Sequence, residues 1–204
     1  MYKLFLSSSF SDVAELFVEF VDEPLKGKKV AFIPTASINE EITFYVDEGK
    51  EALQKLGLII DELEISILEK EEISKKLEIC DYIYVSGGNT FFLLQELKRT
   101  GTDKFLIEQI KLGKVYIGES AGSVILSSNI EYIKEMDDCS VVNLESFSSL
   151  GIIDFYPLPH YKNFPFEECT EKILSKYRNK IKISPFTNTQ AISISKGRFE
   201  ILEK

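Results

Sequence analysis

The chain has 204 residues, of which 44% are hydrophobic and 28% are charged, a composition typical of one folded globular domain. Its formal net charge of −9 excludes proteins that bind nucleic acid or anionic membranes through a basic surface. No apolar run approaches the ~20 residues of a membrane span, and the N-terminal MYKLFLSSSF lacks the pattern of a signal peptide. We therefore expect a cytoplasmic protein.

Short β-branched or aromatic segments alternate with longer amphipathic segments over the first 128 residues. We expect strands at residues 3–6, 29–33, 58–63, 81–85 and 115–117, and helices at residues 12–21, 40–56, 70–78, 90–99 and 102–112. A repeated strand and helix pattern is typical of a largely parallel sheet covered by helices on both faces. The predicted fold class is therefore α/β.

The pattern changes after Ser128. We expect short strands at residues 131–133, 141–144 and 153–156, followed by a helix at residues 167–177. The closing AISISKGRFEILEK contains two alternating runs joined by Lys196 and Gly197, which predicts a C-terminal β-hairpin. No linker or repeat interrupts the chain, so residues 1–204 are predicted to form a single domain.

The segment GESAGS follows the fifth predicted strand and fits the pattern G-x-S-x-G from Gly118 to Gly122. In a nucleophile elbow the serine of this pattern occupies a sharp turn between a strand and a helix, where small neighbours prevent backbone collisions. Ordinary turns also use glycine and serine, but the apolar segments on both sides favour an elbow. Ser120 is the candidate nucleophile.

A catalytic serine needs a base, and the chain contains a single histidine, His160, in YPLPHYKN. A lone histidine is commonly a hydrogen-bonded packing residue, but the stiff Pro157 and Pro159 and the strand before them favour its delivery to the sheet edge that carries Ser120. The third member of a triad would be a carboxylate. Residue types alone leave open Glu131, Glu135, Asp137, Asp138, Glu145 and Asp154.

The segment SGGNT, residues 86–90, is a glycine-rich turn after the fourth predicted strand, and Asn89 or Thr90 could cap the next helix. A backbone N–H of this turn, with the N–H of Ala121, could stabilise a developing oxyanion. A tight turn without a catalytic role explains the motif equally well. A phosphate-binding loop is disfavoured because no Walker lysine follows.

With VSGGNTFFLL, YIGESAGS and PLPHYKN in this order and at these separations, the sequence resembles peptidase family S51, the serine peptidases of dipeptidase E and cyanophycinase. The resemblance covers most of the chain. It implies a three-layer sandwich related to class I glutamine amidotransferases, with Ser120 as nucleophile, His160 as base, and the N–H groups of Gly88 and Ala121 as the oxyanion hole. Counting forward from Ser120 without gaps places Glu135 at the third triad position, with Asp137 in reserve.

The chain departs from dipeptidase E at two places. Glu119 precedes the nucleophile where dipeptidase E has a tryptophan, and mainly acidic residues follow His160 where dipeptidase E has arginines. A carboxylate beside the nucleophile would repel an acidic substrate, so specificity for aspartate is disfavoured. We expect Asn89 and Glu119 to contact the substrate.

The resemblance implies a serine-type exopeptidase that hydrolyses short peptides through an acyl-enzyme, without a metal or organic cofactor. One alternative is a binding or regulatory protein that keeps the fold but has weak or no catalysis, and another is a hydrolase of a β-aspartyl amide such as cyanophycin. The expected partner is a short peptide, with no nucleic acid or membrane, and a homodimer is left open. Cys80, Cys139 and Cys169 lack metal-site spacing and are expected to be reduced thiols.

Overall fold

The computed structural model describes residues 2–204. Its strands are β1 (Lys3–Ser7), β2 (Lys29–Ile33), β3 (Ile59–Glu62), β4 (Tyr82–Val85), β5 (Val115–Glu119), β6 (Tyr156–Leu158), β7 (Ile183–Pro185), β8 (Gln190–Ser195) and β9 (Arg198–Glu203). Its α-helices are α1 (Phe10–Val21), α2 (Phe44–Lys55), α3 (Lys70–Ile79), α4 (Thr90–Thr100), α5 (Thr102–Lys111), α6 (Ala121–Val124) and α7 (Glu167–Tyr177), and its 3-10 helices are η1 (Thr35–Ser37) and η2 (Glu131–Glu135).

Seven strands form one sheet in the order β3-β2-β4-β5-β1-β8-β9. The strands from β3 to β1 are parallel, whereas β8 pairs antiparallel with β1 and β9 pairs antiparallel with β8. Every residue of β4 and β5 is buried, as expected for central strands covered on both faces. The strand that leads into the G-x-S-x-G pattern therefore lies in the middle of the sheet.

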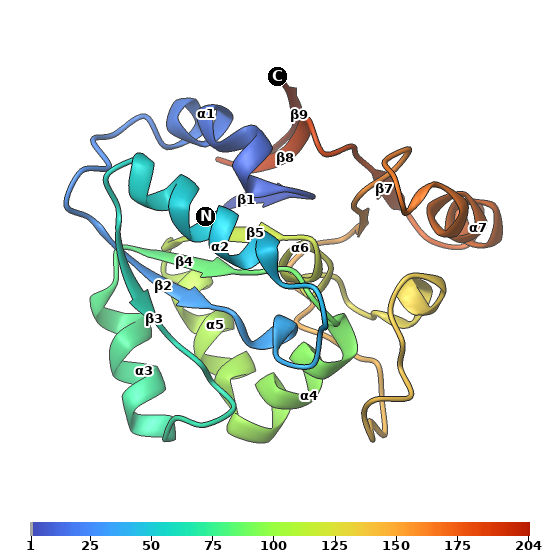
Figure 1. The fold of residues 1–204 in the computed structure, drawn as a ribbon, viewed down its shortest axis with the longest axis horizontal. Helices are drawn as coiled ribbons and strands as arrows, with labels where there is room; N and C mark the ends of the chain where they lie inside the picture. Colours follow the sequence, from blue (N-terminus) through green and yellow to red (C-terminus); the bar gives the residue numbers. More distant parts are fainter. Residues whose placement is uncertain (1) are drawn as a thin grey trace.

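The sheet separates two hydrophobic cores. Leu4 and Leu6 of β1 pack in the core shared with α3, α4, α5 and α6, whereas Phe5 packs in the core shared with α1 and α2. This alternation follows the two-residue period of a strand. Figure 1 shows α1 and α2 on one face of the sheet and α3, α4 and α5 on the other. The predicted α/β sandwich with a largely parallel sheet is confirmed.

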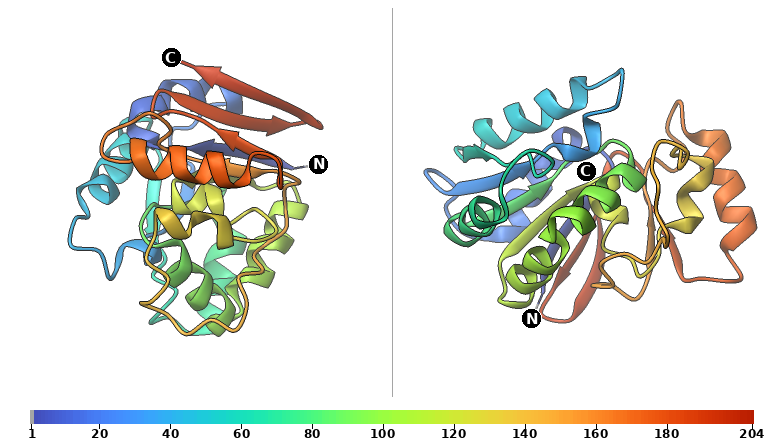
Figure 2. Two further views of the ribbon diagram at one scale, coloured as in Figure 1. Left: turned by 90° about the vertical axis from the view of Figure 1, so that its right-hand side faces the viewer. Right: turned by 90° about the horizontal axis from the view of Figure 1, so that it is seen from below.

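The segment between α6 and β8 lies beyond the carboxyl ends of the parallel strands (Figure 1). There η2 and α7 lie side by side, as both views of Figure 2 show. The short strands β6 and β7 form a separate parallel pair in which Tyr156 faces Ile183 and Leu158 faces Pro185. Because both strands run in the same direction, the segments that follow them, at His160 and Asn188, emerge at the same end.

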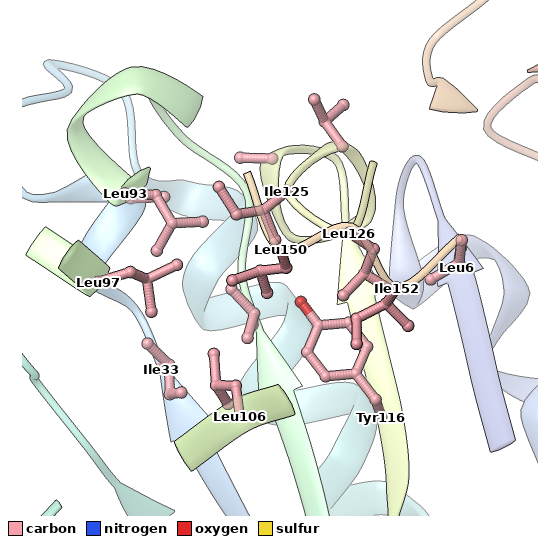
Figure 3. Close-up of a cluster of buried hydrophobic side chains, with 14 of the residues drawn as sticks. Leu6, Ile33, Leu93, Leu97, Leu106, Tyr116, Ile125, Leu126, Leu150 and Ile152 are labelled. Carbon is pink, nitrogen blue, oxygen red and sulfur yellow. The ribbon is translucent and has the colours of Figure 1, made fainter. Parts of the chain in front are cut away.

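Tyr116 links the central strand to the turn that follows it. Its ring lies among Leu6, Leu126 and Ile152 in the core (Figure 3), and its hydroxyl donates a hydrogen bond of 2.7 Å to the carbonyl oxygen of Gly122. An unpaired carbonyl in such apolar surroundings would cost about 1–3 kcal/mol. The buried phenol thus stabilises the position of α6 relative to β5.

The terminal hairpin is confirmed, with β8 and β9 joined by Lys196 and Gly197, which both have positive φ (53° and 76°) as the type I′ turn requires.

Two expected strands are wrong. Residues 131–135 form η2, where the Asn129 side chain accepts a hydrogen bond of 2.7 Å from the Glu131 N–H, and residues 141–144 have no strand pairing in the described chain. The strand expected at residues 153–156 lies at Tyr156–Leu158, and α2 begins at Phe44 rather than residue 40. No helix among residues 2–204 is long and apolar enough to span a bilayer.

Candidate active site

Ser120 occupies a sharp turn between β5 and α6. Its backbone has φ 48° and ψ −105°, a conformation that is strained for a residue with a side chain. The Ser120 N–H donates a hydrogen bond of 2.9 Å to the carbonyl oxygen of Ser7, the last residue of the neighbouring β1. A Cβ atom on Gly122 would lie 2.1 Å from the Val85 carbonyl oxygen, so only glycine allows this close approach. The turn has the geometry of a nucleophile elbow.

His160 reaches Ser120 from the segment after β6. Its Nε2 lies 3.0 Å from the Ser120 Oγ, and its ring stacks on Phe166 with a centroid distance of 4.6 Å and an interplanar angle of 23°. Its backbone N–H donates a hydrogen bond of 3.0 Å to the Ser8 Oγ. These contacts hold the ring on one side of the elbow. Burial lowers the pKa of His160, so the imidazole is neutral near pH 7 and Nε2 can accept a proton.

The other ring nitrogen of His160 contacts Asn188, in the turn between β7 and β8. Its Nδ1 lies 2.9 Å from the Asn188 Oδ1. Because an amide oxygen only accepts hydrogen bonds, this contact fixes the proton on Nδ1 and leaves the Nε2 lone pair directed at Ser120. The Asn188 N–H donates a hydrogen bond of 2.9 Å to the Asn163 Oδ1, which holds the turn in place. Ser120, His160 and Asn188 therefore form a continuous hydrogen-bonded chain.

The expected contact of a carboxylate with His160 needs correction. Glu135 lies exposed on η2, where its Oε1 accepts a hydrogen bond of 3.0 Å from the Lys176 Nζ of α7. Asp137, the reserve candidate, accepts a hydrogen bond of 2.9 Å from the Thr90 N–H at the start of α4. Both carboxylates are engaged by other elements, and the ring nitrogen that they were expected to meet faces Asn188 instead.

Sequence reasoning missed Asn188 for two reasons. The residue expected to orient His160 is a carboxylate, and the candidates for it lie between Ser120 and His160 in the sequence. A signal was present, because TNT at residues 187–189 is a short polar turn between two apolar segments, comparable to the turns that follow β4 and β5.

Gly88 and Ala121 are the residues expected to donate their N–H groups to an oxyanion. Ala121 is the first residue of α6, so its N–H has no acceptor within the helix. Gly88 has φ 129° and lines the same pocket as Ser120, and a Cβ atom there would lie 2.2 Å from the Ala36 carbonyl oxygen.

The side chain of Asn89, expected to contact the substrate, is bound to other parts of the protein. Its Oδ1 accepts a hydrogen bond of 2.9 Å from the Phe92 N–H as the cap of α4, and its Nδ2 donates one of 2.9 Å to the Asp138 carbonyl, so its side chain is engaged in supporting the turn.

Glu119 lies directly before the nucleophile and is only 3% exposed. Its Oε1 accepts a hydrogen bond of 2.8 Å from the Phe10 N–H, and its Oε2 accepts one of 2.8 Å from the Tyr84 hydroxyl. Burial raises the pKa of Glu119 to about 7, and these hydrogen bonds offset part of that effect. The carboxyl group thus joins α1 to the sheet and also lines the pocket beside Ser120.

The pocket in front of Ser120 and His160 has a volume of about 380 Å³. Its wall contains five acidic residues, which are Asp12, Glu40, Glu48, Glu119 and Asp137. It also contains four aromatic residues, which are Phe44, Tyr45, Phe164 and Phe166. The described lining includes neither lysine nor arginine.

Within residues 2–204, no group of three or more His, Cys, Asp or Glu side chains is arranged to hold a metal ion.

Comparisons with known proteins show which proteins the chain is similar to. A crystal structure of a "Putative Peptidase E Protein" from Listeria monocytogenes EGD-e has a TM-score of 0.96 and 53% sequence identity, and covers 100% of this chain and 99% of that chain. An uncharacterised peptidase of Listeria monocytogenes is 56% identical over 195 residues, which are 95% of each chain. Peptidase E of Shewanella amazonensis is 35% identical over 133 residues, which are 65% of this chain and 54% of that protein.

The fold and site define an α/β protein with a serine and histidine pair at the carboxyl edge of a parallel sheet. The model of peptidase family S51 matches residues 4–202, and the chain belongs to this family. The predicted family is confirmed, and with it the assignment to the peptidases.

Replacing Glu119 with glutamine should change how stability depends on pH. The pKa of Glu119 is about 7 in the folded state against 4.5 for an unperturbed group, so between these values the folded state holds the extra proton and the free energy of unfolding falls as pH rises. Over pH 5–7.5 the wild type should lose about 2 kcal/mol more than Glu119→Gln. Urea denaturation at several pH values measures the difference, and parallel curves would contradict the assigned pKa.

Replacing Asn188 with aspartate should raise the pKa of His160. A carboxylate at hydrogen-bonding distance from Nδ1 favours the imidazolium, by about one unit or more. His160 is the only histidine in the chain, so its ring resonances in a proton NMR titration are unambiguous. Asn188→Leu is the matched control, and it should leave the pKa of His160 low. Equal values in wild type and Asn188→Asp would show that residue 188 does not face the ring in solution.

Proposed function

We propose that this protein is a serine-type exopeptidase that hydrolyses short peptides through an acyl-enzyme intermediate. The observation that carries the proposal is the 3.0 Å contact between the Ser120 Oγ and the His160 Nε2 at a strained elbow. Membership of peptidase family S51 and the similarity to proteins named peptidase E support it.

In the proposed reaction the Ser120 Oγ attacks the carbonyl carbon of the scissile bond while the His160 Nε2 takes the hydroxyl proton. The N–H groups of Gly88 and Ala121 stabilise the negative charge that develops on the carbonyl oxygen. His160 then donates its proton to the leaving amine, which departs and leaves the acyl group on Ser120. A water molecule, deprotonated by His160, attacks this ester and releases the acid.

Asn188 has a positioning role in this scheme. Its amide oxygen orients the imidazole and selects the tautomer, but a neutral amide does not offset the positive charge that His160 gains during the attack. An aspartate in the same position would do both. We therefore expect a slower chemical step than in a peptidase whose histidine is paired with a carboxylate.

The same feature favours one other candidate function, a binding protein of this fold with weak catalysis. The neutral Asn188 reduces the driving force for proton transfer, while the pocket and the elbow are intact. Thermal stabilisation by a panel of short peptides, without any release of product over hours, would favour binding. Product formation that disappears in Ser120→Ala would favour catalysis.

Replacing Ser120 with alanine should abolish covalent labelling by a fluorophosphonate probe, because the probe reacts with the activated hydroxyl. The free energy of unfolding should change by no more than about 1 kcal/mol, since the Ser120 side chain makes one hydrogen bond at the pocket surface. Intact-protein mass spectrometry measures the labelling, and urea denaturation measures the stability.

Ser128→Ala is the matched control for this experiment. Ser128 lies eight residues further along the chain, where its hydroxyl pairs with that of Tyr156 at 2.8 Å, so its loss should leave labelling unchanged. Labelling that persists in Ser120→Ala would rule out Ser120 as the nucleophile.

A further inference from the structure

We propose that the pocket selects short peptides in which the residue before the scissile bond has a positively charged side chain, and that it rejects acidic ones. This inference rests on the proposed function and specifies the substrate class of the same site. It assigns a specificity role to the acidic side chains that converge on Ser120 and His160 from separate parts of the chain.

The five carboxylates of the pocket come from five segments. Asp12 lies on α1, Glu40 precedes α2 and Glu48 lies on α2, while Glu119 ends β5 and Asp137 follows η2. Asp12, Glu40 and Glu48 are exposed at the rim, and none of them belongs to a salt bridge among the described residues. Their charge is therefore not neutralised by the protein itself.

These carboxylates act on one another across the pocket. Burial is the main reason why the pKa of Asp137 rises to about 6, and the charge of Glu40 raises it further. The charge of Glu48 likewise adds to the effect of burial on the pKa of Glu119. The pKa of Tyr45 is raised by burial first, and then by Glu40, Glu119 and Asp137. A bound cation would relieve this repulsion, whereas a bound carboxylate would increase it.

The aromatic residues of the pocket suit the same ligand. Phe164 is 86% exposed and Phe44 is 63% exposed, and both lie at the rim. Tyr45 contacts Phe44 edge to face, with a centroid distance of 6.0 Å. Ring faces attract ammonium and guanidinium groups, and rings also pack against the methylene stems of lysine and arginine. A long basic side chain therefore matches the wall better than a small cation does.

The charge of the pocket also indicates which side of the scissile bond it accommodates. In a substrate cut at its N-terminus, the residue before the scissile bond carries a free α-ammonium group, which the carboxylates attract. In a free dipeptide the leaving residue carries an α-carboxylate, and the described lining offers no lysine or arginine to hold it. We therefore expect a dipeptide amide to be a better substrate than the corresponding free dipeptide.

Binding to Ser120→Ala tests the inference without relying on catalysis. Isothermal titration calorimetry would compare Lys-Ala amide, Met-Ala amide and Glu-Ala amide, whose first side chains have similar length but different charge. We expect the lysine peptide to bind about tenfold more tightly than the methionine peptide, and the glutamate peptide to bind most weakly. Equal affinities, or tightest binding of the glutamate peptide, would overturn the inference.

Hydrolysis by the wild type separates this inference from the proposed function. Cleavage of all three amides at equal kcat/KM would overturn the charge preference and leave the serine peptidase intact. Tighter binding of the lysine peptide, with no cleavage of any peptide, would support the preference and count against the peptidase. Cleavage in the order lysine, methionine, glutamate would support both.

Two rim variants identify the residues responsible. Glu40→Gln and Glu48→Gln remove charge at exposed positions, and combined they should reduce the lysine-over-methionine preference by about fivefold to tenfold. Glu41→Gln is the matched control, because Glu41 is an exposed neighbour outside the pocket lining. An unchanged preference in the double variant, or an equal loss in Glu41→Gln, would show that the rim carboxylates do not set specificity.

Discussion

The hydrogen bond from the Ser120 N–H to the Ser7 carbonyl oxygen is the contact on which the site depends. It continues the pairing of β5 with β1 by one residue beyond the end of β5, and so holds Ser120 in a backbone conformation that a residue with a side chain rarely adopts. Ser123 reinforces the turn, because its hydroxyl donates to the carbonyl oxygens of Ser7 and Gly118 at 3.0 and 2.8 Å. The buried hydroxyl of Tyr116 supports the following residues from inside the core.

The rest of the chain brings a histidine to this fixed serine. The pair β6 and β7 places His160 and Asn188 at one end, and the Ser8 hydroxyl joins them to β1 through the His160 N–H and the carbonyl oxygens of Phe186 and Thr187. The hydrogen-bonded chain from Ser120 to Asn188 therefore depends on elements that pair far apart in the sequence. Stability of the central sheet and geometry of the site are consequently coupled.

The features that were predictable from sequence are those set by local pattern. The two-residue period of the strands and the helical period of the segments between them predict the parallel sheet. The small residues around Ser120 indicate the elbow, because a sharp turn after a buried strand needs them. Asn188 was not predictable in this way, since an amide that orients a histidine has no chemical signature distinct from an ordinary turn residue. Counting from Ser120 without gaps points to Glu135, but the turn at Asn129 leads into η2 at residues 131–135, where Glu135 pairs with Lys176.

The wall of the pocket beside Ser120 is acidic. Glu119 is the departure noted in the sequence, and in the structure it is a buried carboxyl group that joins α1 and β4 to the end of β5. Its position beside Ser120 combines a structural role with a contribution to the negative potential of the pocket. Asn188 is neutral and adds no charge behind His160. The electrostatic potential that a substrate meets is therefore set by the side chains of the pocket wall.

The most direct test of the account is to look for the covalent intermediate. Rapid quenching of the protein with lysyl or methionyl p-nitrophenyl ester, followed by tryptic digestion and mass spectrometry, should reveal an aminoacyl adduct on the peptide of residues 115–134, at Ser120. Release of nitrophenol by the protein with no adduct, or with an adduct confined to a cysteine-containing peptide, would contradict nucleophilic catalysis by Ser120.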